Sequence, residues 1–182
     1  MEVLEAIKTR RSIRRYKTTP VDDRAIEVVL EAARWAPSWA NTQCWRFIVV
    51  RDSKIKAELA NITTYNNPST DAIRNAPVVI VACAELGKSG YKDGEQASDK
   101  GDWYMFDVAV AMQNLALAAH SLGLGTVHNG LFDAEKAASI LGIPQGFCAV
   151  EMTPLGYPDQ EPKVRPRKEL SEIVFYDKYG VG

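Results

Sequence analysis

The sequence contains few of the residues that build metal centres or disulfide frameworks. Of its 182 residues, three are cysteine (Cys44, Cys83 and Cys148) and two are histidine (His120 and His128). An odd, widely spaced set of cysteines without a CxxC pair argues against disulfides and against a zinc site. Two histidines are too few for a typical histidine-based metal site. We therefore expect no metal, and the cysteine usage predicts a reducing, cytoplasmic location.

The chain also lacks the long apolar runs that direct or hold a protein in a membrane. Residues 1–10 contain no apolar core of a signal peptide. Polar residues interrupt the most apolar stretch, 102–122, before it reaches the roughly 18 residues of a membrane span. We therefore expect no membrane partner. The length suits one domain of ordinary size, which we place at 1–182.

A large charge of one sign is missing as well. Lys plus Arg number 22 and Asp plus Glu number 23, a formal charge of −1, which makes sequence-blind nucleic-acid binding a poor hypothesis. The average hides two basic clusters without acids, at 8–17 and 163–168. Outside them, 12 basic residues face 23 acidic ones, a balance of −11. Two compact, arginine-rich clusters predict a small anion such as phosphate as partner, although two solvated charge runs are the alternative.

Helical and strand patterns alternate along the chain, which predicts an α/β or α+β class. The expected helices cover 2–9, 22–36, 53–62, 102–122 and 133–141, with Asp22 or Asp23, Ser53 and Asp133 as N-caps. The expected strands cover 45–50, 77–84, 126–128 and 147–152. Residues 63–71 are expected as a loop, 85–101 as a flexible segment or lid, 155–158 as a turn, and 170–176 as extended chain.

The expected helix 102–122 is apolar nearly all round. A helix without a polar face must be buried on all sides. A monomer of this size has little core in which to bury such a helix completely. The pattern therefore predicts burial against a second subunit.

The familiar short motifs are absent. Gly123-Leu124-Gly125 follows a helix and leads into a strand, which is the wrong order for a dinucleotide-binding fingerprint. No Walker A, GxSxG or HExxH sequence occurs. Cys44 has no base beside it in the sequence to activate it as a nucleophile. No side chain is assigned here as a catalytic acid or base.

Three segments carry the chemical signal. In Arg10-Arg11-Ser12-Ile13-Arg14, an extended chain would place Arg10, Ser12 and Arg14 on one side as an anion cradle and Arg11 on the other. The loop 37–43 is full of amide and hydroxyl groups, which suit the mixed edge of a heterocycle. In the segment 165–167, a proline stiffens a second basic loop.

The order and spacing of these segments resemble the flavin-dependent nitroreductase family over nearly the whole chain. The resemblance rests on RRSIRRY, PSWANTQCWRFIVV, NAPVVIVAC, AVAMQNLALAAHSLGLGT and LGYPDQEPKVRPRK followed by ELSEIVF. It implies an α+β fold, a three-layer α/β/α sandwich with a mixed, mostly antiparallel sheet. It further implies a homodimer with exchanged terminal segments that binds FMN at the subunit interface.

The same resemblance assigns roles residue by residue. Arg10 and Ser12 would hold the FMN phosphate or ribityl chain with Arg11 beside them, and Arg14 would lie near the pyrimidine edge of the flavin. Backbone N–H groups of Asn129 and Gly130 would face the flavin N5 and O4 edge, and Asn66 or Asn67 would touch the ring. The tail and the first loop would supply the remaining contacts, from Arg165, Arg167, Pro37, Ser38, Trp39, Asn41 and Gln43, the loop at least partly from the partner subunit.

The implied function is an FMN-dependent oxidoreductase. It would take hydride from NADH or NADPH and reduce a nitroaromatic, a quinone or a related small-molecule acceptor in a ping-pong cycle. The alternatives are a flavin-dependent dehydrogenase or dehalogenase acting on a specific metabolite, and an FMN-binding or storage protein without turnover. Two departures from the family pattern bear on the site: Cys44 stands where proline is usual, and His128 where the stretch is commonly apolar.

Overall fold

The core of the molecule is a four-stranded antiparallel sheet. The computed structural model describes residues 1–180. Its sheet has the strand order β1-β2-β6-β5, formed by Trp45–Val50, Val78–Glu85, Phe147–Gly156 and Gly125–Thr126. A parallel bridge between Ser12 and Thr126 adds the N-terminal segment to the edge. The sheet is thus mixed but mostly antiparallel, as predicted.

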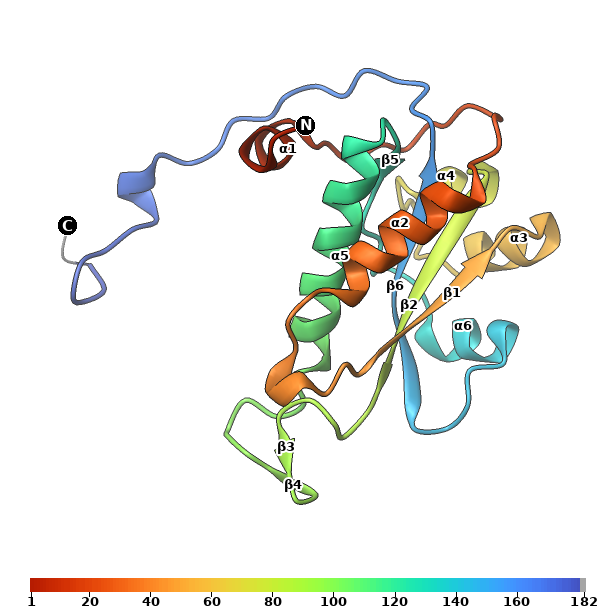
Figure 1. Ribbon diagram of the computed structural model, residues 1–182. Helices are drawn as coiled ribbons and strands as arrows, with labels where there is room; N and C mark the ends of the chain where they lie inside the picture. The colour runs from red at the N-terminus through yellow and green to blue at the C-terminus, as the bar shows by residue number, and fades with distance from the viewer. Residues whose placement is uncertain (181–182) are drawn as a thin grey trace.

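Helices cover both faces of the sheet, which gives three layers (Figure 1). One face carries α2 (Asp23–Arg34) and α5 (Tyr104–Ser121), and α1 (Val3–Thr9) packs at the end of α5. The other face carries α3 (Ser53–Asn61), α4 (Thr70–Asn75) and α6 (Ala134–Leu141). The predicted α+β sandwich is therefore confirmed.

Strand β2 shows why its sequence is a continuous apolar run. Its alternate side chains enter two separate cores: Ile80 packs toward α2 and α5, and Val81 packs toward α3 and α6. A strand buried on both faces has no position for a polar side chain. The run 77–84 therefore predicts both the strand and its central place in the sheet.

The starts of α2, α3 and α6 follow from carboxylate caps. Asp22 accepts from the backbone N–H of Arg24, and Asp133 accepts from that of Lys136, as expected. The prediction of Ser53 as an N-cap is wrong. The carboxylate of Asp52 accepts from the N–H groups of the second and third residues beyond it, at 2.8 and 3.0 Å, so the helix begins at Ser53 itself.

Three boundaries near the sheet edge and the tail also differ from expectation. Residues 155–156 are not a turn, because Leu155 and Gly156 pair with β5 and prolong β6. Strand β5 ends at Thr126 rather than at 128, although Asn129 still bridges to β6. The tail is not extended at 170–172 but forms the 3-10 turn η2 (Leu170–Glu172), closed by a capping box.

Two expected connections contain regular structure. Helix α4 begins inside the expected loop 63–71. The segment 85–101 carries the small hairpin of β3 (Tyr91–Lys92) and β4 (Glu95–Gln96), and its base is held by the fully buried Ser89. A further 3-10 turn, η1 (Trp39–Asn41), lies between α2 and β1.

Helix α5 is not buried on all sides by its own chain. Its inner face packs in the core, but Met105 and Phe106 on the outer side are 56% and 59% exposed. No helix within residues 1–180 is long and apolar enough to cross a membrane. After β6 the chain crosses the end of the molecule near α1 and then runs away from the body (Figure 1). The apolar outer face and the departing tail are both left uncovered by this chain.

Candidate functional site

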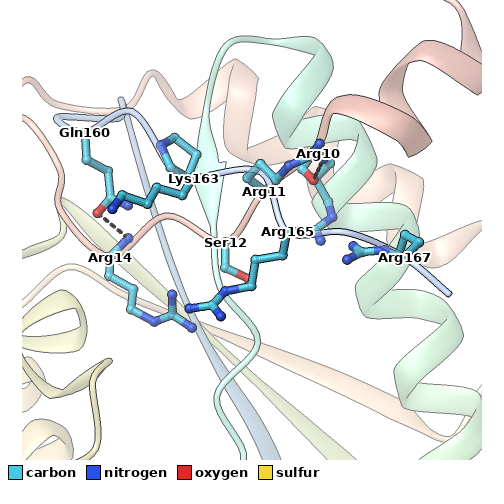
Figure 2. Close-up of a pocket in the computed structure, with 9 residues that line it drawn as sticks. Arg10, Arg11, Ser12, Arg14, Gln160, Lys163, Arg165 and Arg167 are labelled. Carbon is cyan, nitrogen blue, oxygen red and sulfur yellow. Dashed lines mark hydrogen bonds between the residues drawn. The ribbon is translucent and has the colours of Figure 1, made fainter.

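A basic cavity of about 400 Å³ lies between the N-terminal segment and the tail. Figure 2 shows its side chains meeting from the two basic clusters of the sequence. The cavity is lined by Arg10, Arg11, Ser12, Arg14, Gln160, Pro162, Lys163, Arg165 and Arg167. All six of the sequence-predicted residues from these clusters are therefore brought together. Gln160, Pro162 and Lys163 are not among the predicted site residues: Gln160 and Pro162 carry no charge that marks them, and the sequence places Lys163 only in the basic cluster.

Backbone pairing brings the two clusters to one place. The N–H of Ile13 donates to Thr126 at the sheet edge, and Ile13 packs on Gly125, where a Cβ atom would lie 2.7 Å from its side chain. Farther along, the N–H of Lys17 donates to Tyr157, next to the start of the tail. The N-terminal segment is thus held against β5 and against the end of β6, and the tail must leave beside it.

Inside the cavity the arginines converge. The backbone N–H of Arg14 donates to the Gln160 amide oxygen at 3.1 Å, which ties the tail to the segment 10–14. In Figure 2 the guanidinium groups of Arg14 and Arg165 point toward one another beside Ser12, and Arg167 lies on the side of Arg10. Arg10, Ser12 and Arg14 all line the cavity, as the sequence predicts.

Arg11 departs from that prediction. It lines the same cavity instead of facing away. Its Nη1 donates to the carbonyl groups of Lys8 and Arg10 at 2.7 and 2.8 Å, so the guanidinium covers the C-terminal end of α1. The last carbonyls of a helix lack partners and attract cations, which explains why this side chain folds back.

The electrostatics of the cavity favour an anion. Within residues 1–180, Arg10 Nη1 and Arg14 Nε are buried and have no hydrogen-bond partner. Burial lowers the pKa of Arg10, and the charges of Arg11 and Arg167 lower it further. Buried donors and crowded positive charges both cost free energy until an anion satisfies them. Inorganic phosphate or a phosphate ester matches this donor set, because guanidinium groups bind phosphate oxygens in pairs.

A second polar group lies where the chain leaves β5. Asn67 Nδ2 donates to Asn129 Oδ1 at 2.8 Å and to the carbonyl of Leu131 at 2.9 Å. Asn129 is 4% exposed, and its Nδ2 has no partner within residues 1–180. Of the two asparagines left open by the sequence, Asn67 therefore contacts the predicted site. Gly130 follows with an exposed backbone.

Beside this group, His128 forms a pair that the sequence did not indicate. Its Nδ1 lies 2.7 Å from Glu151 Oε1, which also accepts from the Thr153 hydroxyl at 2.5 Å. Glu151 and Thr153 both lie on β6, far from His128 in the sequence, and β6 is bridged to the segment of His128 at Asn129.

The loop 37–43 lies far from the cavity in the same chain. The N–H of Trp39 donates to Asp107 in the first turn of α5, whereas His120 in the last turn lies 2.8 Å from Thr9 beside the cavity. Thirteen residue steps along the helix separate Asp107 from His120, about 20 Å at ~1.5 Å per residue. The predicted residues Pro37, Ser38, Trp39, Asn41 and Gln43 are therefore not brought to the cavity by their own subunit.

Cys44, at the end of this loop, is fully buried and donates to Asp107 Oδ2 at 3.7 Å. Burial, together with the Asp107 carboxylate, raises the pKa of its thiol to about 12. The thiolate is the nucleophilic form of cysteine. Cys44 therefore stays a protonated hydrogen-bond donor and does not act as a nucleophile.

The fold is an α+β sandwich, and its N-terminal segment and tail form an arginine-rich cavity. The sequence profile of the nitroreductase family matches residues 7–68 and 62–157. A protein of Methanothermobacter thermautotrophicus, provisionally named an NADH dehydrogenase/NAD(P)H nitroreductase, is 36% identical over 91% of this chain and 82% of its own. The chain belongs to the nitroreductase family.

Solved structures agree with this assignment. A nitroreductase family protein of Clostridium novyi NT is 34% identical, covers 100% of this chain and 96% of its own, and has a TM-score of 0.77. An FMN-dependent nitroreductase of Clostridium difficile R20291 is 26% identical, covers 96% of this chain and 99% of its own, and has a TM-score of 0.80.

Proposed function

We propose that the chain acts as a homodimer that passes electrons from NADH or NADPH through FMN to small acceptors such as nitroaromatics and quinones. The observation that carries this proposal is the arginine cavity, in which two buried guanidinium donors lack partners within residues 1–180. Membership of the nitroreductase family establishes the general activity: the chain is an NAD(P)H-dependent oxidoreductase that uses FMN. Bound FMN supplies the redox chemistry, and the protein supplies binding, orientation and electrostatics.

The cavity fits the phosphate end of FMN. Arg10 and Arg165 reach it from different elements, and Ser12 adds a hydroxyl group. A phosphate carries up to two negative charges and several acceptor oxygens, which satisfy both the orphaned donors and the crowded positive charge. Arg167 would close the cavity from the tail.

Arg14, together with Asn129 and Gly130, fits the ring end of FMN. Arg14 would place a fixed positive charge near the pyrimidine edge of the flavin, where the reduced ring carries negative charge. The backbone N–H groups of Asn129 and Gly130 would orient the ring, with Asn67 holding the Asn129 side chain in place. These contacts leave the side of the flavin near the exposed residues His128 and Gly130 open. The nicotinamide and then the acceptor could bind there in turn, as a ping-pong cycle requires.

A second copy would complete the site. The loop 37–43 lies at the other end of α5 from the cavity, so it can approach FMN only in a partner subunit. The apolar outer faces of α1 and α5 and the apolar tail residues are exposed in one chain. Contiguous exposed apolar patches commonly mark interaction surfaces. Pairing two chains through these faces, with the tails exchanged, would bury them and bring each loop to the partner's flavin.

One experiment tests the proposed function. The purified protein is loaded with FMN, NADH or NADPH is added without oxygen, and a nitroaromatic or a quinone is then titrated. We expect the flavin absorbance to be lost on reduction and to return with the acceptor. A protein that takes up no FMN would overturn the proposal, and bound FMN that neither nicotinamide bleaches would indicate an FMN-binding protein without turnover.

A further inference from the structure

A single buried carboxylate joins two loops at the start of α5. Asp107 is 1% exposed, and both of its oxygens accept from the N–H of Trp39, at 3.1 and 3.2 Å. Its Oδ2 also accepts from the Ser89 hydroxyl at 2.7 Å and from the Cys44 thiol at 3.7 Å. These donors come from the Trp39 loop (residues 37–44) and from the hairpin segment (residues 86–103).

The carboxylate is held by hydrogen bonds and not by a counter-charge. Within residues 1–180, Asp107 forms no salt bridge. A buried charge without a partner cation costs free energy that only several good hydrogen bonds can offset. Asp107 is also the one acidic residue of α5. This free-energy cost suggests that the carboxylate has a specific structural role.

The Trp39 loop is a segment that needs such a hold. Ala40, Asn41 and Gln43 all have left-handed backbones, with φ of 45°, 57° and 48°. Residues with a Cβ atom rarely adopt this region, because it is sterically unfavourable. Within the loop, the Ser38 hydroxyl accepts from the N–H of Gln43 at 3.0 Å. Asp107 is the contact that ties the strained loop to the rigid helix.

The hairpin segment is tied to the same atom. Ser89 is fully buried, and its carbonyl accepts from the N–H of Trp103 at 3.0 Å, just before α5. Gly90 lies so close to its neighbours that a Cβ atom would be 2.6 Å from the Gly101 carbonyl oxygen. The base of the hairpin segment is therefore packed tightly, and its hydroxyl contact with Asp107 links its position to that of the Trp39 loop.

We propose that Asp107 is a positioning residue that locks the Trp39 loop against the hairpin segment, so that the loop presents its amide side chains to the flavin of the partner subunit. This inference rests on the proposed function, since it takes the Trp39 loop to be a flavin contact. Asp107 itself touches neither cofactor nor substrate, and it acts through Trp39 and its neighbours.

The test compares Asp107→Asn with Asp102→Asn. Asp102 is a matched control because it lies at the same end of α5 and accepts from the N–H groups of Gly87 and Tyr104, but it does not contact the Trp39 loop. An asparagine at 107 presents an N–H₂ group to at least one of its present donors. Hydrogen bonds to charged groups are the stronger class, so we expect the FMN dissociation constant to rise about tenfold.

Two further measurements separate positioning from general stability. We expect Asp107→Asn to change the visible circular dichroism of bound FMN and to raise the hydrogen-exchange rate of the amides in 37–44. Binding of inorganic phosphate to the arginine cavity, at the other end of α5, should stay unchanged. Asp102→Asn should leave the flavin spectrum and the exchange of 37–44 as in the wild type.

Failure of the inference differs from failure of the function. If the wild-type protein binds FMN but Asp107→Asn matches Asp102→Asn in spectrum, affinity and exchange, the inference is wrong. A wild-type protein that binds no FMN overturns the proposed function and the inference with it. Should Asp107→Asn not fold, Ser89→Ala decides: an altered flavin spectrum supports the inference, and an unchanged spectrum contradicts it.

Discussion

Neighbouring arginines in the segment 10–15 have different tasks, and position decides which. Arg10 and Arg14 keep a buried nitrogen without a partner within residues 1–180. The guanidinium group of Arg11 donates to the carbonyl groups at the end of α1. Arg15 is exposed and does not line the cavity. Alternation along an extended chain predicted the first two from sequence, but the fold-back of Arg11 depends on where α1 ends in space.

At this scale, Arg14→Ala tests the role of the ring-end cation. FMN should remain bound through the phosphate cavity, but its reduction potential should fall, because the reduced flavin loses a stabilising positive charge. For a two-electron couple, each ~1.4 kcal/mol of stabilisation that the reduced flavin loses lowers its reduction potential by about 30 mV. The potential is measured by anaerobic titration against a reference dye. Arg15→Ala is the control, and a potential for Arg14→Ala equal to that of the control would refute this role.

The elements are set by their ends as much as by their periodicity. Helix α3 starts after Asp52, whose carboxylate accepts two backbone N–H groups, and these bonds lower the pKa of the Asp52 carboxyl. The sequence predicts Ser53, but serine and aspartate are both good caps, and only the backbone geometry selects Asp52. Helix α5 shows the opposite case, since its composition predicted burial on all sides while its own chain covers only one face.

Asp52→Ala should therefore lower the melting temperature by about 2–4 °C near neutral pH, the effect of losing a cap in a chain of this size. The folded pKa of Asp52 is below its unfolded value, so its contribution is present above the usual carboxyl range. It is lost as the pH falls through the folded pKa. Ser53→Ala is the matched control and should change little. Thermal unfolding at pH 7 and at pH 3 checks both, and equal effects of the two variants at pH 7 would contradict the assignment.

In the whole molecule, a single chain leaves three features separated or exposed. Its cavity gathers both basic clusters at one end of α5, while the Trp39 loop lies at the other end. The outer faces of α1 and α5 and the tail beyond β6 present apolar side chains to solvent. One second copy, related by a twofold axis, would resolve all three features, because such an interface uses the same patch on both subunits.

Leu4→Asp tests this arrangement. Leu4 is 69% exposed on α1, so the change should cost the folded monomer little but should place a charge in the proposed interface. We expect the dimer to dissociate at concentrations at least tenfold higher than for the wild type, and FMN affinity to fall with it. Sedimentation velocity measures the first and flavin fluorescence the second. Tyr65→Asp, at a site 93% exposed between α3 and α4, should leave the oligomeric state unchanged.

The sequence alone determined the apolar strand and helix patterns, the two basic clusters and the family pattern. These signals are local, because periodicity, capping residues and charge runs are written in consecutive positions. Tertiary structure alone decided that the clusters form one cavity, that Asn67 rather than Asn66 reaches Asn129, and that Asp107 joins two loops. These features depend on pairs of residues far apart in the chain, and only the packing of strands and helices brings such pairs within hydrogen-bonding distance.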